Sequence, residues 1–561
     1  MHESVSNADE LISLAQTFLE VLNKGLGSFS EFDKLQCLEK TVATSLALVR
    51  SSTNEWRPIH KLPAEILGRI FQVAMPSNAP GFLRRDDFKA MKTDLRARMV
   101  ISHVCVRWRA IALDMATFWS IVDMTSQPWA LAGLERSKTT SIHVFARYPI
   151  HNTVAGSLLT SRGSLVCGLS LEMPPQHQSI VPDELAMALP PLPNLKCLCI
   201  TTDRGEYDRI RPPIDLEHRP RIFPCPPLRL TKLILSNQCW FPGGIALGQL
   251  THLRITNGTP CNYPSLVALL RQCVLLQQLV LVDIPIINLE DADEAVNGHP
   301  VELPHLRFLT LGSTRIRWSG SYLLRTFAFS QTLILRLFGF EEAGIRGLPR
   351  SSAFTNTFDR LVFQDASVED GMIFQAAGPD PSCGLLFHAQ NMRLPCTTAS
   401  LRPIRQLFFG LMGDLKNITR LTISSMRCDK AVPFFPTMPS VVFLRLVDRE
   451  SVGLTWNDDH LLNAAFHACV VRFPNLVELE IWSPREFIRE LACMPRHLKR
   501  YTFYHIRGDK GDCTRSRDIS PNGPALTLYR EHGVEFKEYD ANQEPDIDLP
   551  GIRPTRGLSD W

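Results

Sequence analysis

The chain has 561 residues, 45% of them hydrophobic, which is enough for several domains or for one long repeat array. Its 60 basic and 57 acidic residues leave a net charge of only +3, so the composition does not indicate a nucleic-acid partner. The first residues lack the basic and apolar regions of a signal peptide, and the longest apolar stretch, near 327–340, is broken by Gln331 and Arg336. We therefore expect no membrane partner and a cytoplasmic and/or nuclear location.

Residues 1–56 form the first segment, for which the sequence predicts helices. Apolar residues recur at helical spacing over Glu10 to Lys24 and over Phe32 to Val49. The heptads are too few and too irregular to predict a coiled coil.

Residues 57–124 form the second segment, and Leu62-Pro63-Ala64-Glu65-Ile66-Leu67 near its beginning predicts the start of a helix. Pro63 suits the first helical position because its missing N–H costs nothing there, and Glu65 falls in the positive first turn. Ile66 and Ile70 are four residues apart, as are Leu67 and Phe71, so we expect one broad apolar face on a helix that ends near Met75-Pro76.

A second helix is predicted farther along this segment, after a charged link from Ser77 to Arg96. One stripe of this helix holds six apolar positions: Ile101, Val104, Cys105, Trp108, Ile111 and Ala112. Two short amphipathic helices cannot bury both faces against each other. They therefore either cover a core elsewhere or leave an apolar patch for a partner.

The order Leu-Pro-x-Glu-Ile-Leu, Ile-Phe, Val-Cys-x-x-Trp-Arg and x-Trp, with the last pair at Phe118-Trp119, resembles an F-box. The whole opening region is similar to F-box-like proteins of mushroom-type fungi. The resemblance implies a domain that docks a Skp-type adaptor and, through it, a cullin. It assigns adaptor binding or domain packing to Leu62, Pro63, Ile66, Leu67, Ile70, Val104, Cys105 and Trp108. The link is longer than in a compact F-box, and an ordinary helical subdomain is the alternative.

Residues 125–507 repeat the pattern apolar-x-x-apolar-x-apolar, which is the strand signature of leucine-rich repeats. The third position of each unit falls at Val144, Leu171, Ile200, Leu235, Ile255, Leu281, Leu311, Leu337, Phe363, Phe387, Ile423, Leu446, Ile481 and Phe503. The units that contain Val144, Leu337 and Phe387 have a polar residue at their first position. The Asn that usually follows such strands is mostly absent, so we expect no Asn ladder and an irregular array.

Helical patterns lie between the predicted strands, over Tyr263 to Cys273, Gly320 to Ser330, Leu401 to Met412 and His460 to Phe473. The predicted fold class is therefore α/β: a helical F-box followed by an irregular leucine-rich-repeat solenoid, with a curved parallel sheet and helices on its convex side. The alternative is an ordinary α/β domain, since strands that alternate with helices produce similar local patterns.

The residue between the last two core positions of each unit is expected on the concave face. Arg254, Arg336 and Arg445 fall there and could bind phosphate or carboxylate groups, although they lie far apart in the repeat order and a solvated surface explains them better. Trp482 and Tyr504, near the end of the array, resemble aromatic anchors of a binding site, and each could equally belong to the core. These five residues are the candidate contacts to an unknown target protein.

Motifs of catalysis and of cofactor binding are missing: there is no phosphate-cradling glycine loop, nucleophile elbow, His-Glu-x-x-His or pair of Cys-x-x-Cys motifs. Cys197-x-Cys199 lies in a predicted strand without a second pair nearby, which argues against a metal site. We expect no cofactor and no enzymatic activity of the chain itself.

The C-terminal part changes in composition. Residues 508–539 are predicted to cap the array, with Ala525 to Tyr529 and Val534 to Tyr539 as candidates for one more helix or edge strand. Residues 540–561, rich in Pro, Gly and Asp, are expected to be disordered.

Together these features predict the substrate-recognition subunit of a Skp-cullin-F-box ubiquitin ligase, in which the F-box binds the adaptor and the repeats hold a target. The alternative is a repeat scaffold without ligase function that carries a degenerate F-box. An enzyme of unrecognised chemistry is a third possibility, which would require turnover by the purified chain alone.

Overall fold

The structure of the chain is a computed structural model. The described residues are 32–75, 87–147, 160–173, 189–202, 225–237, 241–258, 261–287, 300–313, 321–328, 332–338, 358–365, 372–379, 384–389, 415–425, 435–448, 471–483, 498–507 and 534–540, with a few isolated residues between them. They fall into two compact units. The first comprises residues 1–122 and 131–141, and the second comprises 123–130 and 142–561.

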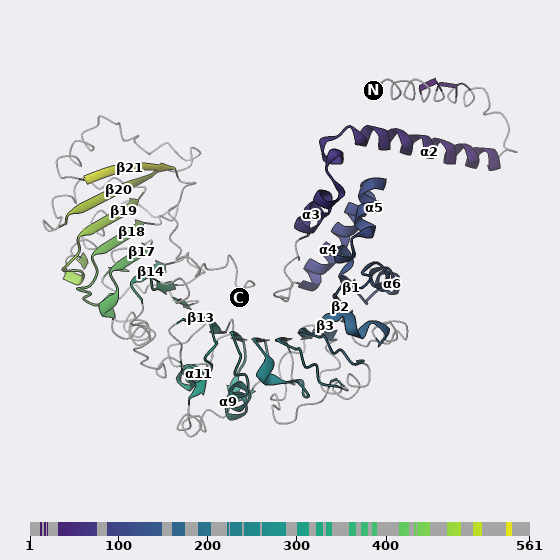
Figure 1. Cartoon of the computed structure of the whole chain (residues 1–561). Coiled ribbons are helices and arrows are strands. Elements are labelled where there is room, and N and C mark those ends of the chain that lie inside the picture. Colours follow the sequence, from purple (N-terminus) through teal and green to yellow (C-terminus); the bar gives the residue numbers. More distant parts are fainter. Residues whose placement is uncertain are drawn as a thin grey trace. The chain divides into compact units, whose positions relative to one another are not determined.

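The first unit is helical (Figure 1). Its elements are α2 (Phe32–Glu55), η1 (Pro58–Lys61), α3 (Ala64–Ala74), α4 (Asp87–His103), α5 (Val106–Asp114) and η2 (Ala116–Trp119). Two further elements, β1 (Ile121–Asp123) and α6 (Gln127–Arg136), span the boundaries between the units. No helix among the described residues is both long enough and apolar enough to cross a membrane.

The second predicted helix is in fact two helices. α4 begins at Asp87, within the stretch predicted as a link, and ends at His103. α5 begins at Val106, with Cys105 in an extended conformation as its N-cap and the Cys105 Sγ accepting from Trp108 N at 3.4 Å. The single stripe predicted through Cys105 is therefore wrong, because the chain changes direction there.

The second unit is built on one long sheet. Its strands are β2 (Ile142–Arg147), β3 (Val166–Met173), β4 (Cys197–Thr202), β5 (Lys232–Ser236), β6 (His252–Thr256), β8 (Gln278–Val282), β11 (Phe308–Gly312), β13 (Ile334–Phe338), β14 (Arg360–Asp365), β15 (Met372–Ala377), β16 (Gly384–Ala389), β17 (Arg420–Ser425), β18 (Phe443–Asp448), β19 (Glu478–Ser483), β20 (Arg500–Arg507) and β21 (Val534–Asp540). Every predicted repeat position lies in one of these strands. The chain is a mixed α/β protein with a long, mainly parallel sheet, as expected of a repeat solenoid.

The strand pairings give the order β2-β3-β4-β5-β6-β8-β11-β13-β16-β15-β14-β17-β18-β19-β20-β21. The predicted sequence of repeats is wrong in the middle of this order. β16 rather than β14 follows β13, and β15, which the repeat pattern does not mark, runs antiparallel between β16 and β14. The third core positions still align across this insertion, with Leu337 opposite Phe387 and Phe363 opposite Ile423.

The first repeat is misplaced by two residues. Ala146, not Val144, lies opposite Leu171, and the register shifts between Ile142 and His143. At the other end β21 extends the sheet in parallel to β20, so the second candidate segment of the predicted cap is an edge strand. The expected disorder of 540–561 concerns residues that, except for Asp540, lie outside those described.

The leucine-type positions of the repeat point to one side of the sheet, and the core of the second unit lies on that side. Leu253, Leu279, Leu309 and Leu421 are at most 1% exposed. Two helices, α9 (Tyr263–Arg271) and α11 (Ser321–Thr326), lie on one side of the β8–β13 segment (Figure 1), and Tyr263 Oη and Thr326 Oγ1 share a hydrogen bond. The two predicted helices are thus shorter than expected. The patterns over 401–412 and most of 460–473 lie outside the described residues.

The short chain segments beside these helices form two small parallel sheets. β7 (Cys261–Asn262) pairs with β9 (Ile286–Ile287), and β10 (Val301–Glu302) pairs with β12 (Phe327–Ala328).

The ends of four neighbouring strands form a short polar ladder that the sequence analysis did not expect. Asn237, Asn257 and Asp283 follow β5, β6 and β8 with φ between 51° and 58°. Each backbone N–H in this row donates to the chain one strand farther on, from Asn237 N to Thr256 O, Asn257 N to Val282 O and Asp283 N to Gly312 O. Asn and Asp tolerate the left-handed conformation better than most residues, which explains their recurrence here.

Candidate docking site

The helical unit contains an aromatic core behind α3 and α5. The ring centroids of Phe71 and Trp108 are 4.8 Å apart, and those of Phe118 and Trp119 are 5.7 Å apart. Trp119 Nε1 donates to Ala112 O at 2.8 Å, which fixes η2 against α5. The motif residues therefore build a domain with its own core.

Pro63 and Leu62 join η1 to α3. Pro63 precedes the first helical residue instead of occupying that position, and its carbonyl accepts from Leu67 N at 3.1 Å. Arg107 Nη2 donates to Leu62 O at 2.6 Å, and Cys105 Sγ lies 3.9 Å from His60 Nε2. These contacts place the start of α3 next to the start of α5.

The predicted broad apolar face of α3 divides into two. Leu67 and Phe71 are at most 1% exposed and point into the core, whereas Ile66 is 48% and Ile70 is 39% exposed. Leu67 therefore cannot contact a partner directly. Ile66 and Ile70 remain available for one, and Val73, 76% exposed, extends the same outer face by one turn.

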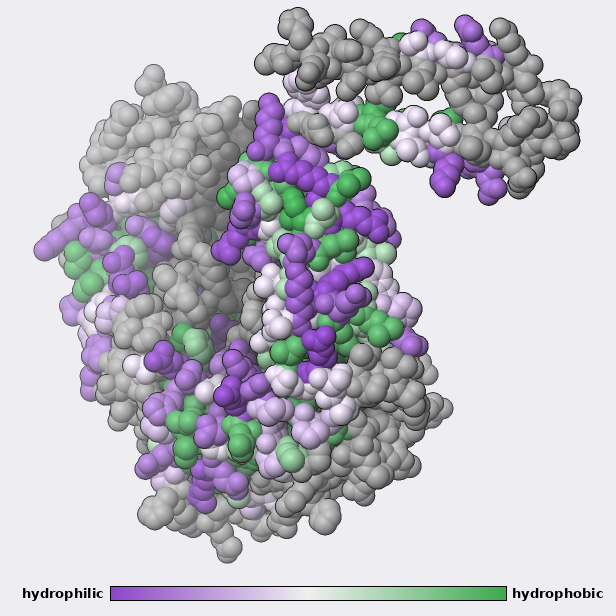
Figure 2. Space-filling view, turned by 45° about the vertical axis from the view of Figure 1, so that its right-hand side comes forward, coloured by the Kyte–Doolittle hydropathy of each residue, from purple (hydrophilic) through white to green (hydrophobic). Residues whose placement is uncertain are grey.

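The start of α5 adds to this exposed apolar surface. Val104 is 49% and Val106 is 77% exposed, and both flank the helix N-cap Cys105. We call Pro63, Ile66, Ile70, Val104 and Val106 the apolar docking surface. Figure 2 shows hydrophobic side chains at the surface of the helical unit between hydrophilic ones.

Three other residues of the predicted adaptor site have structural contacts. Leu62 contributes its carbonyl to Arg107, and Cys105 caps α5. Trp108 is partly buried against Phe71, and its buried indole N–H has no hydrogen-bond acceptor among the described residues. Val106 was missed because the sequence was interpreted as one continuous helix, and the Cys105 N-cap that begins α5 leaves no clear signal in the sequence.

Four of the predicted target residues, Arg254, Arg336, Arg445 and Trp482, lie on the face of the sheet opposite the leucine core. Arg254 on β6 and Arg336 on β13 occupy the same row, separated by Val280 and Thr310. Burial lowers the pKa of Arg336. They do not share a pocket with Arg445, since five strand pairings separate β13 from β18.

Arg445 and Trp482 do come together. Arg445 Nε donates to Glu480 Oε2 at 2.7 Å, and its guanidinium carbon lies 6.0 Å from the Trp482 ring centroid. Trp482 is only 5% exposed, so the core alternative describes it better than a free anchor. Tyr504 lies opposite Trp482 in the register, and its side chain is outside the described part of the chain.

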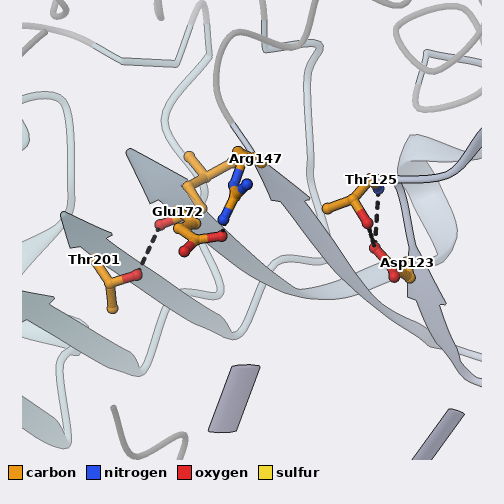
Figure 3. A network of polar contacts seen from close by, with 6 residues as sticks. Asp123, Thr125, Arg147, Glu172 and Thr201 are labelled. Atoms are coloured by element: carbon orange, nitrogen blue, oxygen red, sulfur yellow. Dashed lines mark hydrogen bonds and ion pairs between the residues drawn. The ribbon is translucent and has the colours of Figure 1, made fainter. Parts of the chain in front are cut away.

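A polar network lies at the first strands of the sheet (Figure 3). Arg147 Nε donates to Glu172 Oε2 at 2.9 Å, and Asp123 Oδ1 accepts from both the N–H and the hydroxyl of Thr125. Thr201 Oγ1 donates to Leu171 O at 3.4 Å. These groups bind one another within or between neighbouring strands, which indicates a structural role. Among the described residues no cluster of three or more His, Cys, Asp or Glu side chains is placed to hold a metal.

Comparison with known proteins adds little. No protein-family model matches the chain, and no curated protein matches it. Among solved structures, the crystal structure of the yeast Rad7 and Elc1 complex aligns over 84% of this chain and 98% of that chain, at 13% identity and a TM-score of 0.22. A TM-score this low carries no argument about fold or function. The fold described above rests on the strands and their pairings.

Proposed function

We propose that this chain is a substrate receptor of a Skp-cullin-F-box ubiquitin ligase. The helical unit would dock the adaptor, and the repeat sheet would hold a target protein. The observation that supports this best is the apolar docking surface: five apolar residues on α3 and around the start of α5 remain exposed on a unit that already has a packed core. Soluble proteins seldom leave such residues grouped without a partner.

The chain would act through proximity alone. Binding adaptor and target at once raises the effective concentration of a target lysine near the ubiquitin-conjugating enzyme carried by the cullin. Residues of the chain itself would make no bonds to ubiquitin. The chemistry would belong to the other subunits.

The test is co-expression of the full chain with a Skp adaptor, followed by size-exclusion chromatography and mass determination. We expect a one-to-one complex. Ile66→Asp with Ile70→Asp should weaken it about a hundredfold, because each aspartate replaces an apolar contact of roughly 1.5 kcal/mol and must be desolvated. Both positions are exposed, so the fold should tolerate the change.

Leu228→Asp is the matched control. Leu228 is also apolar and 73% exposed, but it lies in the repeat unit, so this variant should bind the adaptor like the parent chain. A well-folded parent chain that forms no complex would argue against the docking assignment. A complex that forms, yet supports no ubiquitin transfer when cullin is added, would favour the scaffold alternative.

A further inference from the structure

One row of side chains crosses the strand starts in the C-terminal half of the sheet. The register aligns Arg360 on β14, Arg420 on β17, Phe443 on β18, Glu478 on β19 and Arg500 on β20. Side chains at paired positions of parallel strands point to the same face, and neighbouring strands are about 4.8 Å apart. Figure 1 shows these strands side by side.

Arg360 and Arg420 are direct neighbours in this row. Like charges at facing positions of a sheet are destabilising unless something compensates them. Arg360 Nε lies 3.7 Å from Asp359 Oδ1, too far for a hydrogen bond, and this buried Nε has no hydrogen-bond partner among the described residues. Arg420 is exposed, and within the described part of the chain it has no ion pair.

The guanidinium of Arg420 is nevertheless held in place. Its carbon lies 4.4 Å from the centroid of the Phe443 ring, a cation–π contact that restrains the side chain. Arginine that is stacked in this way loses less conformational freedom when it binds an anion, and its N–H edge remains free to donate.

Two further arginines of this region have acidic partners. Arg445 Nε bonds Glu480 Oε2 at 2.7 Å, and Arg500 Nη1 lies 4.0 Å from Glu478 Oε1. With Asp359 beside Arg360, four arginines face three carboxylates, so the cluster has an excess of one positive charge. One carboxylate matches this excess, whereas a phosphate monoester carries ~1.5 to 2 negative charges.

We propose that the pair Arg360 and Arg420 binds one carboxylate of an acidic segment of a partner protein, with Arg420 as the bidentate donor. This inference rests on the proposed function at one point only: the partner protein that carries the carboxylate is taken to be the target of the ligase. The carboxylate belongs to an Asp or Glu side chain or to a C-terminus, and its chain lies across the strand starts.

The test measures binding of the full chain to a fluorescent, C-terminally amidated peptide with one Glu between Gly and Ser residues, and to its Gln twin, by polarisation at low salt. We expect the Glu peptide to bind and the Gln peptide to bind at least tenfold more weakly. Arg420→Gln should weaken the Glu peptide about tenfold, since a charge-assisted bidentate contact is lost. Arg420→Lys should also weaken it, because the fork is lost while the charge is kept.

Arg307→Gln is the matched control, since Arg307 is an exposed arginine of the same unit outside this row, and it should leave the affinity unchanged. Equal binding of the Glu and Gln peptides, or parent-like binding by Arg420→Gln, would overturn the proposal. A phosphoserine peptide that binds more than tenfold tighter than the Glu peptide would overturn the assignment to a single carboxylate. Adaptor binding is measured separately on the same samples. A chain that binds the adaptor but not the Glu peptide contradicts this inference alone, whereas a well-folded chain that does not bind the adaptor contradicts the proposed function.

Discussion

Phe338 shows how little room a single position of the sheet allows. It is fully buried and packs with Val280 and Val282 on the face opposite the leucine core. Its ring lies over Gly312, its direct partner in the register. A Cβ on residue 312 would come within 2.5 Å of the ring, so the absence of a side chain there is what lets the aromatic ring fill this site.

Gly312→Ala should therefore destabilise the repeat unit by about 1–3 kcal/mol, because the ring must leave its position or the strands must separate. The measurement is the urea midpoint of the repeat unit by circular dichroism. Gly248→Ala is the control, since its Cβ would meet nothing closer than Gln272 O at 3.7 Å. If the two substitutions had equal effects, the steric account of Gly312 would be wrong.

The burial of His143 should make the stability of the sheet depend on pH. Its Nε2 lies 3.1 Å from Ser170 Oγ, and its ring covers Gly168. Burial lowers the pKa of His143 to about 4, whereas an unfolded chain has a histidine pKa near 6.5. Between these values the unfolded chain binds more protons, so the stability should be constant above about pH 7 and fall as the pH drops from 6.5 to 4.

This expectation can be checked by comparing urea midpoints of the repeat unit at pH 7.5 and pH 5. The decrease should become smaller in His143→Gln and persist in His305→Gln, which changes an exposed histidine. Some decrease should remain in His143→Gln, because burial and Lys232 also lower the pKa of His252. An unchanged decrease in His143→Gln would exclude His143 as its main source.

At the scale of the element, the sequence predicted where strands occur much better than how they are ordered. Each strand places two leucine-type residues two positions apart on the core face of the sheet, and the repeat pattern reveals them. The order of β14, β15 and β16 depends on which edge each strand pairs with, and that choice leaves no local pattern. β15 in particular, with Phe374 and Ala376 buried and Gln375 also fully buried, lacks the spacing of the repeat.

The helices show the same division between local and tertiary information. The apolar positions of α3 were recognised, but their spacing alone could not separate Leu67, which fills the core, from Ile66, which stays exposed. The break before α5 depends on the Cys105 cap and on contacts to His60 that lie 45 residues apart in the chain. The docking surface could therefore be predicted as a region and not as a list of contact residues.

At the scale of the whole molecule, the chain consists of two units with separate cores. Leu67, fully buried, belongs to the core of the helical unit, and Leu279, also fully buried, belongs to that of the sheet. Truncating a buried leucine to alanine costs about 2–5 kcal/mol and acts first on the cooperative unit that contains it. The unit that contains the substituted leucine should therefore unfold at a lower temperature than in the parent chain.

Differential scanning calorimetry of the full chain should accordingly show two transitions. Leu67→Ala should lower the midpoint of one, and Leu279→Ala that of the other, because each cavity removes contacts from a single core. If both substitutions lowered one common transition equally, the units would unfold together, and adaptor docking would be energetically coupled to the repeat sheet. Two separate shifts would mean instead that a variant can lose adaptor binding while its repeat sheet stays folded. The docking proposal and the carboxylate proposal can then be tested independently.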